Sequence, residues 1–288
     1  MRKASKWLAA LVVVALMIAL VAVAGCSSSS TTGSSTTGTA TTTPTTVTIK
    51  TVKPGVIQFG SDTAFPPFET MNGTTAEGFD VDLAAAIAKE MGMKSEFVSQ
   101  KFDTLLPQLI AGGKFDAAMS GMTITDERKK QVDFSTPYID SNQSVAVVKG
   151  KGFTKIATGD TAAIQKALTG KNIGVQSGTT GEAWAKENLK AAKKIIPFDD
   201  TLSAFAALQA GKVDAIVNDL PVSAYVVKDP ARNMELIAEI PTGEQYGIAI
   251  AKTTPELTTA INAALAKVKA SGEYATIYQK WFGVAPPQ

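Results

Sequence analysis

The stretch Leu109-Ile-Ala-Gly-Gly-Lys-Phe-Asp-Ala-Ala-Met119 decides the fold prediction, because a helical pattern ends there at glycine and Asp-Ala opens an apolar strand. The same arrangement returns in Leu208-Gln-Ala-Gly-Lys-Val-Asp-Ala-Ile-Val217. Glycine readily adopts the left-handed conformation that ends a helix and turns the chain into the next strand. One interpretation is a common helix-to-strand turn that occurs twice by chance. The interpretation that we favour is a chain built from two similar α/β lobes.

Along the chain, short apolar runs alternate with segments of helical period. The apolar runs Val56–Phe59 and Phe115–Met119 flank Asp80–Met91, in which apolar residues recur every three or four positions. Such alternation predicts an α/β fold with mainly parallel sheets. Further helices are expected at residues 105–111, 182–189 and 201–210, and two more within 255–282, separated at Ser271-Gly272.

The two repeated strands end in comparable polar clusters. These clusters are Ser120-Gly-Met-Thr123 and Asn218-Asp219. Ligands of open α/β sheets bind beyond the carboxyl ends of the strands. Two lobes that present such strand ends to each other would therefore form a ligand cleft.

The charge distribution indicates a near-neutral body, and the composition excludes histidine chemistry. The 288 residues include 28 Lys+Arg and 26 Asp+Glu, a net charge of +2, and three of the cations lie in the first 25 residues, which contain no acid. Subtracting these three leaves −1 for the rest, which gives no electrostatic case for a nucleic-acid partner. With no His and one Cys, the sequence excludes Ser-His-Asp and Cys-His nucleophiles, HExxH and CxxC metal sites, and an internal disulfide.

The first 48 residues are interpreted as a targeting signal and a tether. Residues 7–24 carry no charge and run into Val23-Ala-Gly-Cys26, which resembles a lipobox. Residues 1–25 would then be a lipoprotein signal peptide, and Cys26 would be lipidated. The alternative is a membrane span that ends at an ordinary apolar Cys26. Both place the body outside the cytoplasmic membrane. Seventeen of residues 27–48 are Ser or Thr, so residues 26–48 are expected to form a flexible stalk.

Arg128 is a candidate carboxylate-binding residue. It lies just past a strand end, in Thr123-Ile-Thr-Asp-Glu-Arg128, and Thr125 could cap the helix that carries it. A planar guanidinium can hold a carboxylate through two parallel, charge-assisted hydrogen bonds. The alternative is an arginine on the helix surface that pairs with Glu127 or a neighbouring residue.

Three further groups of residues could contribute to the cleft. Ile173–Glu182 has the pattern of a strand, a glycine-rich turn and a helix start, whose amides favour a carboxylate, although an ordinary turn has the same pattern. Asp62 and Asp219 stand at strand ends and suit an ammonium, guanidinium or amide, with capping and turn roles as the alternative. Phe65 and Phe102 could stack on a ligand side chain or could belong to the core.

Taken in order, these segments resemble the polar-amino-acid group of bacterial extracellular solute-binding proteins, family 3, which serve ABC importers and have the periplasmic-binding-protein type II fold. The resemblance covers about residues 52–283. Its strongest signature is Gly78-Phe-Asp-Val-Asp-Leu-Ala-Ala-Ala-Ile-Ala-Lys-Glu-Met91. The other matching segments are Phe102–Leu109, Thr123–Arg128, Asp133–Tyr138, Gln245–Ala249 and Gly272–Gly283.

The resemblance implies a two-lobed α/β protein with a central ligand cleft and two hinge strands. Lobe 1 would comprise residues 49–141 plus 246–288, and lobe 2 residues 142–245. The hinge strands would lie near residues 140–143 and 243–246. A ligand that contacts both lobes would stabilise the closed state.

The resemblance also implies ten residues that contact an L-amino acid. Among them, Arg128 would hold the α-carboxylate, Asp219 the α-ammonium, and Asp62 the polar end of the side chain. The other members are Phe65 and Phe102, on either side of the ligand side chain, and Ser120, Gly121, Thr123, Gln176 and Thr179.

The expected ligand has a polar or basic side chain. Asp62 has no nearby cation in the sequence, so it suits arginine or glutamine and disfavours acidic ligands. Relatives that bind glutamine tend to carry Lys and His where this chain has Gln176 and Asn218, which argues against strict glutamine specificity.

The implied function is capture of this amino acid by a monomeric protein that is lipid-anchored at the extracytoplasmic face of the cell membrane, and delivery to an ABC transporter permease. No cofactor, metal or enzymatic activity is implied. One alternative is an enzyme on the same fold, such as a cyclohexadienyl-type dehydratase, in which Arg128 would hold a carboxylate and Asp62 would protonate a leaving group. The other is a ligand sensor that docks onto a separate receptor.

Overall fold

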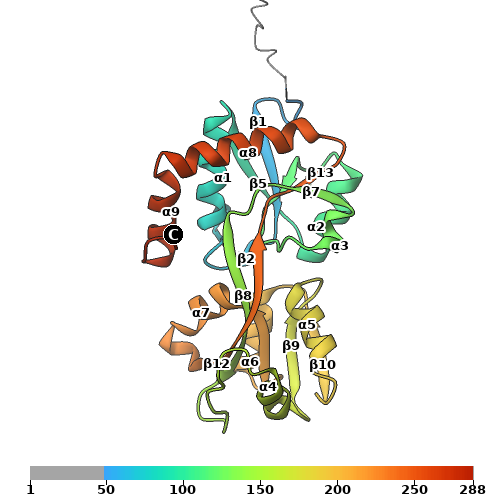
Figure 1. The fold of residues 1–288 in the computed structure, drawn as a ribbon, viewed down its shortest axis with the longest axis vertical. Helices are drawn as coiled ribbons and strands as arrows, with labels where there is room; N and C mark the ends of the chain where they lie inside the picture. The colour runs from blue at the N-terminus through green and yellow to red at the C-terminus, as the bar shows by residue number, and fades with distance from the viewer. Residues whose placement is uncertain (1–48, 288) are drawn as a thin grey trace, which may run out of the picture. The chain divides into compact units, whose positions relative to one another are not determined.

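The computed structural model describes residues 49–287. Two five-stranded sheets, each accompanied by helices, form this part of the chain (Figure 1). The predicted signal peptide, the lipidation at Cys26 and the stalk lie outside the described residues. Among residues 49–287, no helix has the length and apolar character that a membrane span needs.

The sheet of the first lobe has the strand order β5-β1-β6-β13-β7. Its central strand β1 (Val56–Ser61) pairs in parallel with two strands, β5 (Lys94–Ser99) and β6 (Ala117–Ala118). Strand β13 (Ala249–Ala251) pairs antiparallel with both β6 and β7 (Val132–Phe134). The helices of this lobe are α1 (Phe79–Glu90), α2 (Phe102–Ala111), α3 (Asp126–Lys129), α8 (Pro255–Ala270) and α9 (Glu273–Phe282).

The sheet of the second lobe has the order β10-β9-β11-β8-β12. Strand β9 (Asn172–Gln176) pairs in parallel with β10 (Lys194–Phe198) and β11 (Ala215–Asp219). Strand β8 (Ile139–Val148) lies antiparallel between β11 and β12 (Met234–Tyr246). The helices of this lobe are α4 (Thr161–Leu168), α5 (Thr180–Asn188), α6 (Thr201–Gln209), α7 (Leu220–Val227) and the short η1 (Pro230–Arg232).

In both sheets, parallel pairing is limited to three strands. The two remaining strands of each sheet are antiparallel to their neighbours, and in each lobe they are the segments through which the chain enters or leaves. The expectation of mainly parallel sheets therefore holds only for the βαβ part of each lobe. A βαβ unit needs a crossover helix, whereas a strand that arrives from the other lobe does not.

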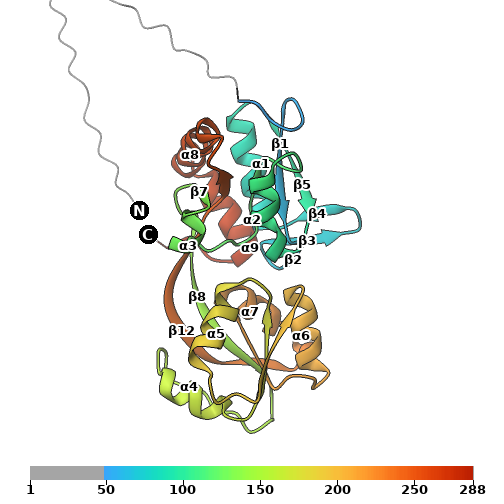
Figure 2. The ribbon, with the colours of Figure 1, turned by 90° about the vertical axis from the view of Figure 1, so that its right-hand side faces the viewer.

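Strands β8 and β12 connect the two sheets as an antiparallel pair, as Figures 1 and 2 show. The pairing begins beside the first lobe, where Ile139 faces Tyr246, and continues to Val148 opposite Met234. The register shifts between Ile240 and Glu244, which interrupts the ladder close to the lobe boundary. The two hinge strands predicted near residues 140–143 and 243–246 lie in this pair.

The sequence repeat corresponds to a repeated structure. Helix α2 ends at Gly112 with φ 75°, helix α6 is followed by Gly211 with φ 70°, and a strand follows each glycine. The aspartates of the repeat also act alike. Asp116 Oδ2 accepts a hydrogen bond from the Gln58 amide at 2.8 Å, and Asp214 Oδ2 accepts one from the Asn172 amide at 2.7 Å. Each aspartate thus ties its strand to the start of the neighbouring parallel strand.

A small antiparallel sheet was not expected from the sequence. It consists of β2 (Ala64–Phe65), β3 (Glu69–Asn72) and β4 (Thr75–Glu77), and it leads into helix α1 (Figure 2). Gly78 joins the two with φ 146°, and a Cβ there would lie 1.9 Å from the Phe68 carbonyl oxygen. Only glycine fits this junction, so the glycine of the Gly78–Met91 signature has a steric cause.

The core of the first lobe lies between its sheet and the helices α1 and α8. Helix α1 buries Leu83 and Ile87 completely, and α8 buries Ile261 and Leu265. Each such side chain contributes about 1.5–3 kcal/mol through removal from water. The C-terminal helices are therefore core elements of this lobe, as the apolar stripe in residues 255–282 predicts.

Candidate functional site

The ten predicted site residues lie at strand ends, in turns and in helices α2 and α3, on the facing sides of the two lobes. Asp62 follows β1, Gln176 ends β9 and Asp219 ends β11. Gln176 donates a hydrogen bond from Nε2 to Asp62 Oδ2 at 2.6 Å, so the two lobes contact each other here. We call the following set the interlobe site: Asp62, Phe65, Phe102, Ser120, Gly121, Thr123, Arg128, Gln176, Thr179 and Asp219.

Arg128 spans the two lobes instead of pairing with Glu127. One guanidinium nitrogen donates to the carbonyl oxygen of Thr123 at 2.7 Å, and the other donates to that of Gly178 at 3.0 Å. The guanidinium also lies over the ring of Phe102, 5.3 Å from its centroid. Thr125 caps helix α3 by accepting a hydrogen bond from the Arg128 amide, as predicted. The short helix, its cap and the aromatic ring together fix the direction of this side chain.

The guanidinium of Arg128 has no carboxylate partner within ion-pair distance among residues 49–287. Burial lowers the pKa of Arg128, and the nearby charges of Asp219 and Glu244 oppose this effect. The two hydrogen bonds of the guanidinium go to neutral carbonyl groups, so the positive charge is stabilised by no anion in direct contact. A charge in such surroundings favours an anionic ligand, and a guanidinium suits a carboxylate best.

Asp219 provides a buried carboxyl group at the end of β11. Its Oδ1 accepts a hydrogen bond from Gln143 Nε2 at 2.6 Å, and its Oδ2 accepts a short one from the hydroxyl of Tyr246. Burial, and then the charge of Glu244, raise the pKa of Asp219 to about 7. A cation placed beside this group would lower that pKa and stabilise the ionised form. An ammonium group is such a cation.

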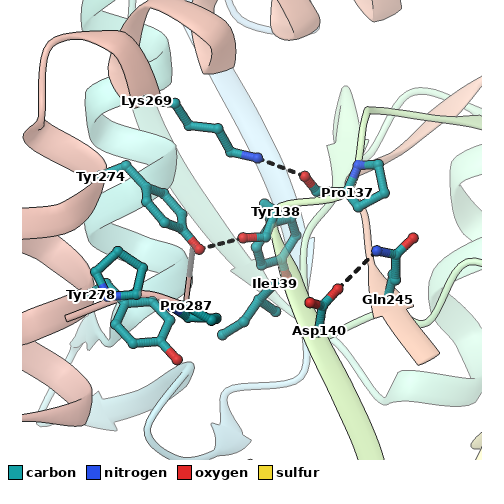
Figure 3. Close-up of a pocket in the computed structure, with 10 residues that line it drawn as sticks. Pro137, Tyr138, Ile139, Asp140, Gln245, Lys269, Tyr274, Tyr278 and Pro287 are labelled. Atoms are coloured by element: carbon teal, nitrogen blue, oxygen red, sulfur yellow. Dashed lines mark hydrogen bonds between the residues drawn. The ribbon is translucent and has the colours of Figure 1, made fainter. Parts of the chain in front are cut away.

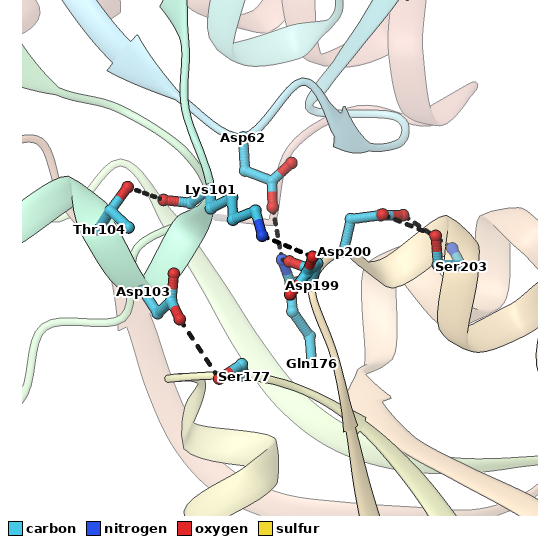
Figure 4. A network of polar contacts seen from close by, with 9 residues as sticks. All are labelled: Asp62, Lys101, Asp103, Thr104, Gln176, Ser177, Asp199, Asp200 and Ser203. Atoms are coloured by element: carbon cyan, nitrogen blue, oxygen red, sulfur yellow. Dashed lines mark hydrogen bonds and ion pairs between the residues drawn. The ribbon is translucent and has the colours of Figure 1, made fainter.

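Asp62 belongs to a second acidic region, shown in Figure 4. Burial, and then the charge of Asp200, raise the pKa of Asp62 to about 6. A hollow of about 500 Å³ opens beside it, lined also by Asp199, Asp200 and Lys101. Lys101 and Asp199 form an ion pair of 2.6 Å between the lobes, with both side chains more than half exposed. The carboxylates near Asp62 outnumber the cations, so this end of the interlobe site suits a cationic or amide group.

The aromatic members and Gly121 fill the first-lobe side of the interlobe site. Phe65 is 5% exposed and lies 5.9 Å, centroid to centroid, from Phe68. Gly121 has φ 52°, and a Cβ there would lie 2.5 Å from the Phe65 ring and 3.2 Å from the Tyr246 ring. Phe102 is 9% exposed and lies under Arg128. Both predictions for the two rings, core packing and ligand contact, are compatible with these positions.

Three of the polar members are occupied within the protein. The Ser120 hydroxyl accepts from the Asp62 amide at 2.9 Å and donates to Glu69 at 2.7 Å. Thr179 caps α5 and donates to the Gln176 carbonyl oxygen at 2.8 Å. The Gln176 side chain donates to Asp62 and accepts from Thr201 at 2.7 Å. These three side chains position the interlobe site through the contacts that they already make.

Two residues that the sequence analysis did not single out, Glu244 and Gln143, join the interlobe site. Glu244 Oε2 accepts hydrogen bonds from Thr123 at 2.9 Å and from Thr180 at 2.7 Å. Gln143 Nε2 lies within 3.3 Å of both Glu244 oxygens and donates to Asp219 as well. Gln143 and Glu244 are in the two predicted hinge segments, so position at the lobe crossing was the signal that could have identified them.

A separate hollow of about 370 Å³ lies beside the start of β8 (Figure 3). None of the ten interlobe residues lines it. Three of its polar side chains form hydrogen bonds: Lys269 donates to the Pro137 carbonyl oxygen at 2.8 Å, Tyr274 donates to that of Tyr138 at 2.5 Å, and Gln245 donates to Asp140 at 2.8 Å. These contacts brace the beginning of the hinge strand against helices α8 and α9.

Comparison with known proteins gives one consistent family. Residues 57–284 match the sequence model of the bacterial extracellular solute-binding proteins, family 3. A putative ABC transporter arginine-binding protein 2 of Escherichia coli is 36% identical over 78% of this chain and 90% of its own length. A probable histidine-binding protein of Neisseria gonorrhoeae is 39% identical over 79% of this chain and 83% of its own. The solved structure of an ancestral arginine-binding protein bound to arginine has a TM-score of 0.73 and 43% identity, covering 80% of this chain and 99% of that one.

Proposed function

Because this chain belongs to the bacterial extracellular solute-binding proteins, family 3, we propose that it captures a polar or basic L-amino acid at the interlobe site and delivers it to an ABC transporter permease. The two-lobed fold with a pair of connecting strands is suited to this task. A ligand that contacts both lobes stabilises their closed arrangement by its differential affinity.

The observation that carries the proposal is the pair of opposite charges left available in one site. Arg128 has no carboxylate within ion-pair distance among the described residues, and buried Asp219 has no cation in contact. The α-carboxylate of an amino acid would supply the missing anion and its α-ammonium the missing cation. Such a ligand compensates both charges at once, which an isolated anion or cation cannot do.

The acidic end of the interlobe site supports a basic or amide side chain. Asp62 faces the hollow that Asp199 and Asp200 also line. A guanidinium can donate to several carboxylate oxygens, and a carboxamide can donate to one. Arginine is therefore the first candidate and glutamine the second, in agreement with the arginine-binding names of several relatives.

We propose the remaining site roles as they follow from the resemblance. Gly121, Thr123 and the turn at Thr179 would help to hold the α-carboxylate, and Phe65 and Phe102 would enclose the side chain. The position of Arg128 over Phe102, with a hydrogen bond to the Gly178 carbonyl oxygen, supports a carboxylate position at the turn before α5. Ser120 and Gln176 would act through their contacts with Asp62.

We further propose that the protein is a monomer, anchored by lipid on Cys26 to the extracytoplasmic face of the cell membrane. Lobe 1 would comprise residues 49–141 and 246–288, and lobe 2 residues 142–245. The support for the anchor is the Val23–Cys26 motif followed by a Ser/Thr-rich segment. Mass spectrometry of the mature N-terminus tests it, because processing removes residues 1–25 and adds acyl mass to Cys26.

We propose a binding role without catalysis. The two curated relatives compared above are named as binding proteins, and the chain contains no histidine that could serve as a proton relay. Asp62, the acid of the dehydratase alternative, accepts a hydrogen bond from Gln176 at 2.6 Å. Turnover of a cyclic carboxylic acid that is abolished by Asp62→Asn would overturn this part of the proposal.

A thermal-shift screen of the standard amino acids tests the proposed function. The protein is first unfolded, dialysed and refolded to remove ligand. A ligand at about 100 times its Kd stabilises the folded state by about 2.7 kcal/mol, which raises the unfolding temperature measurably. Arginine or glutamine should give this rise in the wild type, and Asp219→Asn should reduce it. A flat response to every amino acid would contradict the proposal.

A further inference from the structure

Two completely buried carboxyl groups lie behind the interlobe site without a cation. Glu69 is in β3 and Asp80 is in α1, and both are 0% exposed. Neither takes part in any ion pair within residues 49–287. Buried carboxylates normally need a positive partner or several hydrogen-bond donors. The number of hydrogen-bond donors around each carboxyl group therefore indicates whether it is ionised or protonated.

The surroundings of Asp80 favour the ionised form. Its Oδ2 accepts hydrogen bonds from the Gly121 amide at 3.0 Å and from the Tyr138 hydroxyl at 2.8 Å. Donors of this kind stabilise a carboxylate. Burial raises the pKa of Asp80 to about 6, and these two hydrogen bonds oppose that rise.

The surroundings of Glu69 favour the protonated form. Its Oε1 accepts a single hydrogen bond, from the Ser120 hydroxyl at 2.7 Å. Burial, and then the charge of Asp80, hold the pKa of Glu69 well above its ordinary value. The other acid that acts on Glu69 is Asp62, which also disfavours a second negative charge.

The second oxygen of each carboxyl group can form a hydrogen bond with the other group only when one of the two is protonated. Glu69 Oε2 and Asp80 Oδ1 are fully buried, and neither receives a hydrogen bond from another residue. Glu69 is joined to Ser120 and Asp80 to the adjacent Gly121, and the charge of Asp80 is close enough to raise the pKa of Glu69. Two adjacent carboxyl groups in a dry site cannot both be ionised without strong repulsion. One proton between Glu69 Oε2 and Asp80 Oδ1 satisfies both oxygens.

We propose that Glu69 stays protonated at neutral pH and donates a hydrogen bond to Asp80, and that this acid–carboxylate pair positions the Ser120–Gly121 turn of the interlobe site. The chain of contacts runs from the Asp62 amide to the Ser120 hydroxyl, and from there to Glu69. On the other side, Asp80 holds the Gly121 amide. Loss of the proton would set two charges against each other directly behind the turn. The link between this pair and ligand binding rests on the proposed function, whereas the presence of the shared proton does not depend on that function.

Infrared spectroscopy of the ligand-free protein at pH 8 tests the shared proton. At this pH, Asp62 and Asp219, with pKa values near 6 and 7, are mostly ionised, so a carbonyl band of a protonated carboxyl group reports Glu69. The wild type should show this band, and Glu69→Gln should lack it. Asp80→Asn should keep the band but shift its frequency, because the carboxylate that accepts the hydrogen bond from Glu69 is replaced by a neutral amide.

Three infrared outcomes would overturn the proposal. Absence of the band in the wild type would show that both groups are ionised, and this measurement needs no variant to fold. A band that persists in Glu69→Gln would place the proton on another residue. A band whose frequency is unchanged in Asp80→Asn would show that Glu69 donates no hydrogen bond to Asp80.

The pH dependence of stability gives a second measurement. Because the folded-state pKa of Glu69 is raised, its stabilising effect is complete below the ordinary pKa and is lost as pH rises through the folded-state value. The denaturation midpoint of the wild type should therefore fall toward alkaline pH. Glu69→Gln keeps both hydrogen bonds without a titratable proton and should reduce this fall, whereas an unchanged fall in that variant would count against the proposal.

Ligand affinity separates positioning from packing. Glu69→Gln should keep the affinity for the captured amino acid within about threefold, while Glu69→Ala should weaken it by about tenfold, since the Ser120–Gly121 turn loses its support. Equal affinities in the two variants would show that the pair does not position the turn. Should no amino acid bind the wild type, the proposed function falls while the infrared result still decides the shared proton.

Discussion

Replacement of Arg128 by alanine tests the interlobe site most sharply. The side chain makes two charge-assisted hydrogen bonds, to the carbonyl oxygens of Thr123 and Gly178, and lies 5.3 Å from the Phe102 centroid. Its remaining donors are available to a ligand carboxylate. Removal of one partner from a buried pair of charges costs about 3–5 kcal/mol. The dissociation constant should therefore rise by about two to three and a half orders of magnitude, because 1.4 kcal/mol corresponds to tenfold.

Titration calorimetry of ligand-stripped protein measures this change. Arg232→Ala is a matched control, since Arg232 is the other arginine among the described residues and pairs at 3.5 Å with Asp229 in the same turn. It should bind the amino acid like the wild type. Arg128→Lys should also bind poorly, because an ammonium cannot form the two parallel hydrogen bonds of a guanidinium. A folded Arg128→Ala variant whose dissociation constant stays within about threefold of wild type would refute the carboxylate assignment.

The remaining predictions concern side-chain preference, pH and backbone geometry. Asp62→Asn should weaken arginine binding by about tenfold or more and glutamine binding less, as competition calorimetry would show. An equal loss for both ligands would show that Asp62 does not contact the side chain of the bound amino acid. Affinity should fall as pH is lowered through about 7 and then 6, because protonation of Asp219 and Asp62 removes the charges that hold a cationic ligand, and titrations in two buffers should detect proton release on binding. The stability of the ligand-free protein should change in the opposite sense. Both raised pKa values favour the folded state most at low pH, and this contribution is lost as pH rises through about 6 and 7, which denaturation at several pH values would show. Gly121→Ala should destabilise the protein by about 1–3 kcal/mol in denaturant unfolding, since φ is 52° and a Cβ would lie 2.5 Å from the Phe65 ring; a neutral effect would contradict the steric argument.

Periodicity and local turn chemistry allowed much of the fold to be predicted from the sequence. The helix–glycine–Asp-Ala repeat was confirmed in detail, because a helix end and the start of a buried strand are both set by neighbouring residues. The small sheet β2–β3–β4 was missed, since its strands have only two to four residues and show no clear alternation. The antiparallel direction of strands β13 and β8 was not predicted, because it depends on where the chain crosses between the lobes.

The interlobe site was predictable where residue type and strand-end position coincide. Asp62 follows β1, Asp219 ends β11 and Arg128 lies in the short helix α3. The structure places all three on the facing sides of the lobes. Glu244 was missed because its partners, Thr123 and Thr180, lie more than 60 residues away in the sequence. The proton shared by Glu69 and Asp80 depends on burial and on unmatched oxygens, which no spacing of residues reveals.

The most direct test of the central claim is calorimetric titration of the refolded, ligand-free protein with each standard L-amino acid at pH 8. At this pH, Asp62 and Asp219 are mostly ionised. We predict saturable binding of one molecule of arginine or glutamine per chain, with a dissociation constant well below about 1 mM, and no comparable binding of aspartate or glutamate. Failure of every amino acid to bind more tightly than about 1 mM would contradict amino-acid capture at the interlobe site.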